Sequence, residues 1–205
     1  MRTVARTLPA LLGLLAVGIA PAPAAGEMRS VQLKTNLCKT TGGGKFVDIP
    51  GFPGEKIDRR LLPDIRWMKR NYLIFITDGF AMSGHAANGE HPLGLATDIV
   101  PHRSRGGTWG KIDRLAEKAE PRQDRPRLPW RWVGYDGDAG HGRGHHLHLS
   151  CSHNANTTPG KPARWVLTRR CPTTPDGTSP DSGGISTQRE SGLLAGLAPA
   201  IPERN

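Results

Sequence analysis

The segment 145–150 constrains the fold more than any other, because histidine and leucine alternate along it. His146 and His148 are two residues apart, with Leu147 between them and Leu149 after them. Side chains of a β-strand point alternately to opposite faces, so this spacing predicts a strand. One face then carries both imidazoles, and the other carries leucines that need an apolar core. The chain must therefore build a sheet with one covered face and one face that presents histidine.

A second motif, from His91 to Asp98, offers another pair of metal-binding side chains. His91 precedes a turn that includes Gly94, and Asp98 lies in a strand expected over 95–100. Imidazole nitrogen and carboxylate oxygen both bind zinc well, at about 2.0–2.2 Å. Three protein ligands from the two motifs would leave a fourth position for water, as in hydrolytic zinc sites. The remaining histidine could accept the proton of that water, because its pKa lies near working pH.

Each part of this pattern also has a plainer interpretation. A single histidine in a loop is more often a polar surface residue, and Asp98 alone could cap a turn. The stretch 141–153 holds five histidines and could bind metal nonspecifically. The combination of ligand types, spacing and placement at strand ends favours the zinc site.

The remaining pattern predicts short strands and two helices. Further strands are expected over 46–49, 72–77, 130–134 and 164–168. The face formed by Leu61, Ile65 and Met68 predicts a helix within 57–70 that becomes regular near Pro63.

A second helix is expected around 112–119 and ends before Pro121. Residues 25–45, near the start of the domain, are expected to be loosely ordered. Short strands together with two helices predict an α+β fold, a small antiparallel sheet with helices packed on one face.

The two ends of the chain are expected to lie outside this domain. Residues 1–24 combine a basic start, an apolar run and the small-residue sequence Ala22-Pro23-Ala24, which is typical of a secretory signal peptide. The apolar run is well short of the roughly 20 residues that span a bilayer, so no membrane span is expected in the mature chain. The domain is expected over 25–172, and the Pro-, Ser-, Thr- and Gly-rich tail 173–205 is expected to be disordered. These features predict a secreted protein, extracellular or associated with the cell wall.

The charge balance bears on the partners of the chain. Its 28 basic and 18 acidic residues give a formal net charge of +10. A basic exported protein is attracted to anionic surfaces such as cell-wall polymers, although a simply solvated surface is about as compatible with the charge. The basic residues are scattered rather than clustered, so no specific nucleic-acid partner is expected. The chain is expected to be a monomer.

Three cysteines leave one without a partner within the chain. Cys151 continues the leucine face of the histidine-bearing strand and is expected to be a small core residue. Cys38 and Cys171 lie near the two ends of the ordered region, so a bridge between them would tie these ends together. We favour that pair, and a bridge between Cys151 and Cys171 stays open.

Both motifs resemble those of a known group of enzymes. Residues 91–99, HPLGLATDI, resemble the first zinc motif of the D-Ala-D-Ala metallopeptidases, and residues 146–148, HLH, resemble the second motif of their His-x-His branch. Residues 76–80, ITDGF, are similar to the strand before the site in that family. By order of elements the similarity covers roughly residues 57–150. The chain thus resembles the zinc peptidases of the D-Ala-D-Ala carboxypeptidase, lysostaphin-type endopeptidase and hedgehog fold group.

The resemblance implies a hedgehog-like or D-Ala-D-Ala-peptidase-like fold and a Zn²⁺ cofactor. It implies that His91, Asp98 and His148 hold the zinc and that His146 is the catalytic base. It also implies hydrolysis of peptide bonds in peptidoglycan, where zinc polarises the scissile carbonyl and an activated water attacks it.

The chain departs from the family at two positions. Many carboxypeptidases of the group carry, after Gly79 and an aromatic residue, an arginine that binds the terminal carboxylate of the substrate, and this chain has Ala81 there. Gly89 stands where a serine is common. Both differences favour an endopeptidase, or a member with an altered substrate, over a D-Ala-D-Ala carboxypeptidase. His85 and Glu90 are expected to be solvated loop residues.

Two other function classes are considered. The first is a non-catalytic, zinc-stabilised module that binds the cell wall, which the basic charge and the missing arginine support. The second is a metal-dependent nuclease of the His-Asn-His type, suggested by His145, His146, His153 and Asn154. The nuclease ranks last, because prolines at 159 and 162 interrupt the expected strand-helix pattern.

Overall fold

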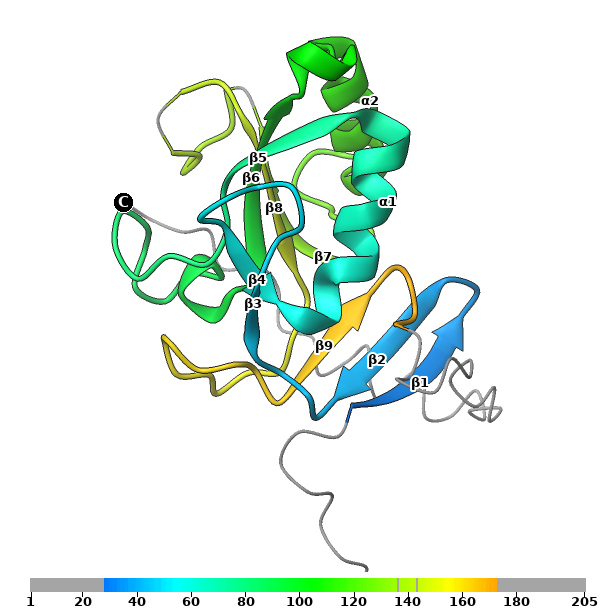
Figure 1. Cartoon of the computed structure of the whole chain (residues 1–205), viewed down its shortest axis with the longest axis vertical. Helices are drawn as coiled ribbons and strands as arrows, with labels where there is room; N and C mark the ends of the chain where they lie inside the picture. Colours follow the sequence, from blue (N-terminus) through cyan, green and yellow to red (C-terminus); the bar gives the residue numbers. More distant parts are fainter. Residues whose placement is uncertain (1–27, 136, 143, 173–205) are drawn as a thin grey trace, which may run out of the picture.

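A four-stranded antiparallel sheet forms the centre of the protein (Figure 1). The computed structural model describes residues 28–172 except 136 and 143. The strand order of the central sheet is β5-β6-β8-β7. These strands are β5 Ile74–Asp78, β6 Ala96–Pro101, β7 Trp130–Gly134 and β8 Leu147–Cys151. The four strands expected here from the sequence are confirmed, with boundaries that differ by two residues at most.

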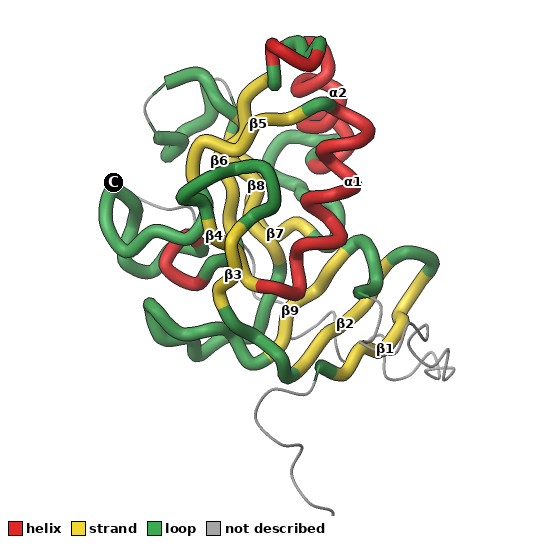
Figure 2. The backbone as a smooth tube through the Cα atoms, in the orientation of Figure 1, coloured by secondary structure: helices red, strands yellow, loops and turns green. Residues whose placement is uncertain are grey.

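Two helices cover one face of this sheet (Figures 1 and 2). They are α1, Leu62–Tyr72, and α2, Trp109–Ala119. Their apolar stripes, including Ile65 and Leu115, join the core together with strand residues such as Ile76. Pro63 lies in the first turn of α1, where its missing N–H costs no hydrogen bond, and the predicted start of that helix is confirmed. The arrangement is α+β, with helices on one face of a small antiparallel sheet.

The alternation in β8 divides that strand between the core and the opposite face. Leu147, Leu149 and Cys151 are buried within the main hydrophobic cluster. His148 lies between them in sequence and therefore points to the face that the helices do not cover. The predicted role of Cys151 as a small core residue is confirmed, since it is buried and forms no disulfide.

A second antiparallel sheet lies beside the first and has the order β1-β2-β9 (Figure 1). It consists of β1 Arg29–Lys34, β2 Leu37–Thr41 and β9 Trp165–Thr168. The expectation that 25–45 is loosely ordered is wrong for this hairpin. Its strands are short and polar, and β2 is stabilised by pairing with β9, from the other end of the domain. Asn36, with a φ of 64°, takes the left-handed conformation that the tight turn requires.

Smaller elements complete the domain. The strands β3, Phe46–Asp48, and β4, Lys56–Asp58, pair with each other. The described part of the chain also has three short 3₁₀ helices, η1 Arg59–Leu61, η2 His91–Leu93 and η3 Arg103–Arg105.

A disulfide joins Cys38 in β2 to Cys171, just after β9. The favoured pairing is therefore confirmed, and the alternative bridge to Cys151 is excluded. The disulfide closes 133 residues of sequence and ties the two ends of the described domain together.

The predicted signal peptide 1–24 and tail 173–205 lie outside the described residues. Among the residues that are described, no helix has both the length and the apolar character needed to cross a bilayer.

Candidate metal centre

His91 is held by a short helix that ends in a left-handed glycine. Pro92 lies in the first turn of η2, and Gly94 ends that turn with a φ of 63°. The Gly94 N–H donates to the His91 carbonyl at 2.9 Å. A Cβ at position 94 would lie 2.8 Å from the ring of Phe46, so a larger residue does not fit there. The left-handed backbone conformation is a second reason for glycine at this position. The sequence His-Pro-Leu-Gly thus folds into one compact turn that buries the His91 imidazole.

Asp98 and His148 reach the same point through strand register. They are direct cross-strand partners in β6 and β8, and Asp98 is also paired with Asp78 of β5. The His148 Nδ1 lies 2.9 Å from the Asp98 Oδ1. Partners in register share a face of the sheet. The two sequence motifs, which are about fifty residues apart, are therefore joined by the pairing of two central strands.

The backbone of Gly79 sets the tautomer of His91. The His91 Nδ1 lies 2.5 Å from the Gly79 carbonyl oxygen, to which only a protonated nitrogen can donate. In the neutral ring this leaves a lone pair on Nε2, and that lone pair faces Asp98 and His148. Hydrogen bonds of this kind orient the histidines of metal sites. Gly79 itself is closely packed, since a Cβ there would lie 2.2 Å from the Lys56 carbonyl oxygen.

The three inward-facing atoms form a triangle with two sides of 3.3 Å and one of 2.9 Å. The His91 Nε2 lies 3.3 Å from both the Asp98 Oδ1 and the His148 Nδ1. Ligand atoms of a tetrahedral zinc ion, at about 2.0–2.1 Å from the metal, lie about 3.3–3.4 Å from one another. Two imidazole nitrogens and one carboxylate oxygen are also a ligand set suited to such an ion. His91, Asp98 and His148 are thus placed to bind a metal ion.

The other nitrogen of His148 confirms which side of its ring faces the cluster. The His148 Nε2 is buried and has no hydrogen-bond partner among the described residues. The ring of Trp132 packs against this imidazole, with centroids 4.6 Å apart. The polar contacts of His148 with His91 and Asp98 are both made by Nδ1, so His148 would bind a metal through Nδ1.

His146 lies beside this triangle, one residue before β8 begins. Its Nε2 is 3.6 Å from the Asp98 Oδ1, and its Nδ1 is 3.0 Å from the Gly144 carbonyl oxygen. Because a carbonyl can only accept, Nδ1 carries the proton in the neutral ring and Nε2 has the lone pair. The predicted pair His146 and His148 therefore shares one face, with His148 inside the triangle and His146 at its edge.

The electrostatics of the cluster favour an ionised carboxylate. Burial opposes the charge of Asp98, but its contacts with the His148 and His91 imidazoles hold the pKa of Asp98 far below its ordinary value. Burial also opposes the charge of His91, yet Asp98 raises the pKa of His91 above its usual range. Burial lowers the pKa of His148. The site therefore concentrates negative charge beside imidazole nitrogens, which is the arrangement that attracts a cation.

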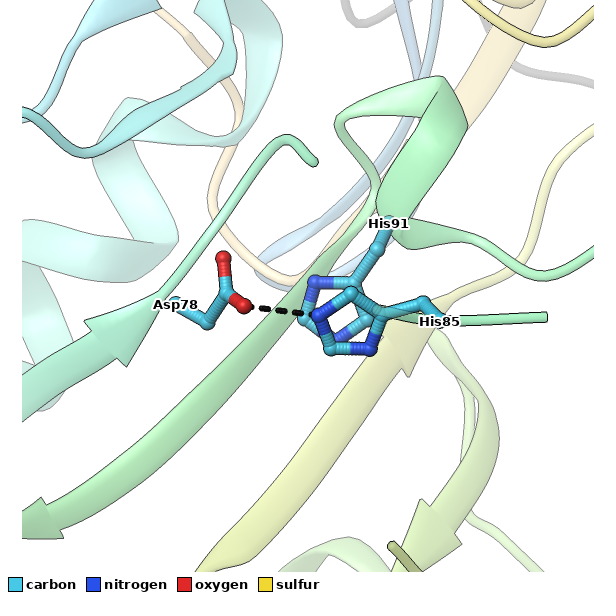
Figure 3. Close-up of side chains that lie close together, drawn as sticks. All are labelled: Asp78, His85 and His91. Atoms are coloured by element: carbon cyan, nitrogen blue, oxygen red, sulfur yellow. Dashed lines mark hydrogen bonds and ion pairs between the residues drawn. The ribbon is translucent and has the colours of Figure 1, made fainter. Parts of the chain in front are cut away.

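His85 and Asp78 form a second group beside the first, and Figure 3 shows both with His91. The His85 Nε2 lies 2.7 Å from the Asp78 Oδ2, and the His85 ring stacks on His91 with centroids 3.7 Å apart. The prediction that His85 is a solvated loop residue is therefore wrong. Asp78, His85 and His91 could also hold a metal ion, but His91 belongs to both groups. Because the His91 Nδ1 donates to the Gly79 carbonyl, only the Nε2 lone pair of His91 can bind a metal. That lone pair points to Asp98, so His91 can act as a ligand in the group with Asp98 and His148.

Glu90 is also not a solvated loop residue, because its side chain is buried. Its Oε1 lies 3.3 Å from the His153 Nε2 and 3.1 Å from the Arg131 Nε. Although burial opposes the charge, His153 and Arg131 hold the pKa of Glu90 below its ordinary value. This group fixes the residue next to His91. Sequence alone gave no indication of it, since Glu90 and His153 are far apart in the chain.

Aromatic side chains border the cluster on the β7 and β8 side. Trp130 is a core residue, whereas Trp132 contacts His148. The ring of Trp109 stacks in parallel on His145, with centroids 3.7 Å apart. Both tryptophans therefore contact the histidine motif, and Trp109 also packs against the main core.

Comparisons with known proteins do not place the chain in a family. No family model matches it, and no match was found among curated proteins or solved structures.

Proposed function

We propose that this chain is a secreted, zinc-dependent peptidase that hydrolyses peptide bonds in peptidoglycan. The observation that carries the proposal is the buried triangle of His91, Asp98 and His148, with the His146 Nε2 3.6 Å from the same Asp98 oxygen. Three protein ligands with a base beside them are typical of a hydrolytic zinc site rather than a structural one. The resemblance of both sequence motifs to D-Ala-D-Ala metallopeptidases supports the reaction class.

The residues of the chain supply distinct parts of this chemistry. Zinc in the triangle would act as a Lewis acid towards the scissile carbonyl and lower the pKa of a water molecule. His146 would accept the proton of the attacking water at Nε2, because its Nδ1 is occupied by the Gly144 carbonyl. The same nitrogen could then return the proton to the leaving amine. Gly79 would hold the His91 ring in the tautomer that leaves Nε2 for the metal.

Two further observations support the substrate and location. Ala81 stands where related carboxypeptidases have a carboxylate-binding arginine, which favours cleavage within a peptide rather than at its end. The Cys38–Cys171 disulfide is typical of an oxidising, exported environment. Without Arg2 and Arg6 of the predicted signal peptide, 26 basic and 18 acidic residues leave a net charge of +8, which would favour attachment to the anionic cell wall.

The test is digestion of purified peptidoglycan by the zinc-loaded protein, with new amino groups and released fragments measured by mass spectrometry. We expect cleavage by the wild type and a loss of roughly 10²–10⁴-fold in rate for His146→Gln, with zinc content unchanged. His102→Gln serves as the matched control, because His102 contacts Ser104 and Phe75 rather than the triangle.

Wild-type protein that binds zinc and peptidoglycan without cleaving it would favour the non-catalytic wall-binding module instead. Equal activity in His146→Gln and wild type would remove His146 from the proposed role of base.

A further inference from the structure

A basic cleft lies apart from the candidate metal centre. It has a volume of about 530 Å³ and is bordered by the turn between β1 and β2, by both helices, and by the segments before β7 and after β9. Five of the described side chains that line it are cationic, and none of the lining side chains is acidic. The five cationic residues are Lys34, Lys118, Arg127, Arg169 and Arg170, and the cavity that they line is called the basic cleft.

Two of these arginines are held in place by the fold. The backbone N–H groups of Arg169 and Arg170 donate to the two carboxylate oxygens of Asp64 in α1, at 3.2 and 3.0 Å. The Arg170 guanidinium also donates to the Asn36 Oδ1 in the hairpin turn at 3.1 Å. The disulfide follows immediately after Arg170. The cleft is therefore lined by a fixed backbone rather than by a mobile surface segment.

The cations gather around one aromatic ring. Arg169, Arg170 and Lys118 lie 5.2, 5.5 and 5.9 Å from the centre of the Trp67 ring. Attraction to the ring holds each cation, but like charges so close together repel one another. Burial lowers the pKa of Arg169. The charges of Asp64 and Tyr72 oppose this shift, and those of Arg127 and Arg170 add to it. Such crowding is relieved by an anion that contacts several of these side chains at once.

Hydrogen-bonding capacity also remains in the cleft. The Nε atoms of Arg169 and Arg170 are buried and have no hydrogen-bond partner among the described residues. An unsatisfied buried donor costs free energy, and the surrounding protein leaves one such donor on each of these guanidinium groups. Arginine recognises phosphate and carboxylate through paired N–H groups, and lysine adds a point charge.

We propose that the basic cleft binds an anion that carries more than one phosphate group. Five cations exceed what a single carboxylate can neutralise, and the volume lies within the range of roughly 300–1,000 Å³ that is usual for organic ligand sites. The same chemistry could come from a soluble diphosphate compound or from a phosphodiester polymer of a cell surface. The proposal is independent of the metal centre, because none of its residues belongs to that centre.

The test is calorimetric titration of the full chain with inorganic pyrophosphate and, separately, with poly(glycerol phosphate). The variant is Lys118→Gln/Arg127→Gln, in which both changed side chains are exposed and the core is left intact. The charge-matched control is Arg103→Gln/Arg105→Gln, two exposed arginines in η3, which precedes α2. We expect binding to at least one probe, weakened at least about tenfold in the cleft variant and unchanged in the control.

The two probes identify the source of the ligand. Binding of pyrophosphate alone indicates a soluble ligand, and binding of the polymer alone indicates a phosphodiester chain. If neither probe binds at low salt, or if the control weakens binding as much as the cleft variant does, the proposal is overturned. Arg169→Gln provides a second variant inside the cleft, and its binding should weaken in the same direction. Zinc content should be equal in all of these proteins, which separates this result from failure of the proposed peptidase function.

Discussion

His148 lies directly opposite Asp98 in the register of β8 and β6, and its Nδ1 is 2.9 Å from the Asp98 Oδ1. Leu147 and Leu149, on the other face of the same strand, are buried in the core. A slip of one residue would exchange these two faces and bury the histidine among leucines. The apolar core and the candidate metal centre are therefore fixed by one pairing, and the packing of the leucines holds the ligand in position.

The two possible ligand groups around His91 make different predictions. Because the His91 lone pair points to Asp98, we expect His85→Ala to keep its zinc and His148→Ala to lose it, with a decrease in affinity of at least about tenfold. The measurement is zinc competition with a chelator for both variants. Loss of zinc in His85→Ala together with retention in His148→Ala would assign the metal to the Asp78 side instead.

The buried ion pair of Asp58 and Arg60 should dominate the stability of the region beside the second sheet. Both side chains are fully buried, and Arg60 contacts both carboxylate oxygens, at 2.9 and 2.6 Å. Arg60 also donates to the carbonyls of Thr40, Ala163 and Arg164. Arg60→Met leaves the Asp58 charge without its partner, so we expect a loss of about 3–5 kcal/mol in the free energy of unfolding.

Urea unfolding of Arg60→Met measures this loss. The matched control is Arg66→Met, an exposed arginine of the neighbouring helix α1, which should change stability by less than about 0.5 kcal/mol. Equal losses of unfolding free energy in the two variants would show that the buried ion pair contributes no more to stability than an exposed arginine does.

Asp64 should make the stability depend on pH. Burial raises the pKa of Asp64 to about 7, despite the N–H groups of Arg169 and Arg170 that oppose this shift. In the unfolded chain the pKa is about 3.9, so between pH 4 and 7 the folded state binds more protons than the unfolded state. By linkage, the contribution of Asp64 to stability falls as pH rises through this window, by at most about 1.4 kcal/mol per pH unit.

Urea unfolding of wild type and Asp64→Asn at pH 5 and pH 8 tests the sign. The free energy of unfolding of Asp64→Asn, relative to that of wild type, should be higher at pH 8 than at pH 5, because the amide does not ionise. A relative loss at pH 8 would mean that the two N–H groups outweigh burial.

The Cys38–Cys171 disulfide should stabilise the whole domain. It closes a loop of 133 residues, so its loss in Cys38→Ser/Cys171→Ser should cost about 2–5 kcal/mol. The control variant is Cys151→Ala, compared with wild type in the same way, because it removes a buried thiol without opening a disulfide. Thermal unfolding that is insensitive to reductant in the wild type would contradict this prediction.

Much of the central sheet could be predicted because its signals are local. The alternation of His146, Leu147 and His148 predicts a strand and its two faces without knowledge of any partner. The turn at Gly94 is similarly local, since its left-handed φ of 63° is one that glycine adopts without strain. These patterns were sufficient to bring His91, Asp98 and one histidine of the pair His146 and His148 together as candidate ligands, and the choice of His148 came from the resemblance.

Other features could not be predicted because they depend on distant partners. The β1–β2 hairpin has few apolar residues, with Val31 still 42% exposed, and owes its order to β9 and the disulfide. Glu90 gives no local indication of burial, because His153 and Arg131 come from other parts of the chain. The basic cleft likewise gathers cations from separate segments, so scattered charges in the sequence form one cluster in space.

The most direct test of the account is the metal content of the purified protein, measured by plasma mass spectrometry for wild type, Asp98→Ala and Asp48→Ala. Asp48 is a suitable control because its side chain is 84% exposed. The account predicts about one zinc per chain in wild type and Asp48→Ala, with a sharp loss in Asp98→Ala. Zinc absent from the wild type, or retained equally by Asp98→Ala, would contradict the three-ligand site and the peptidase proposed from it.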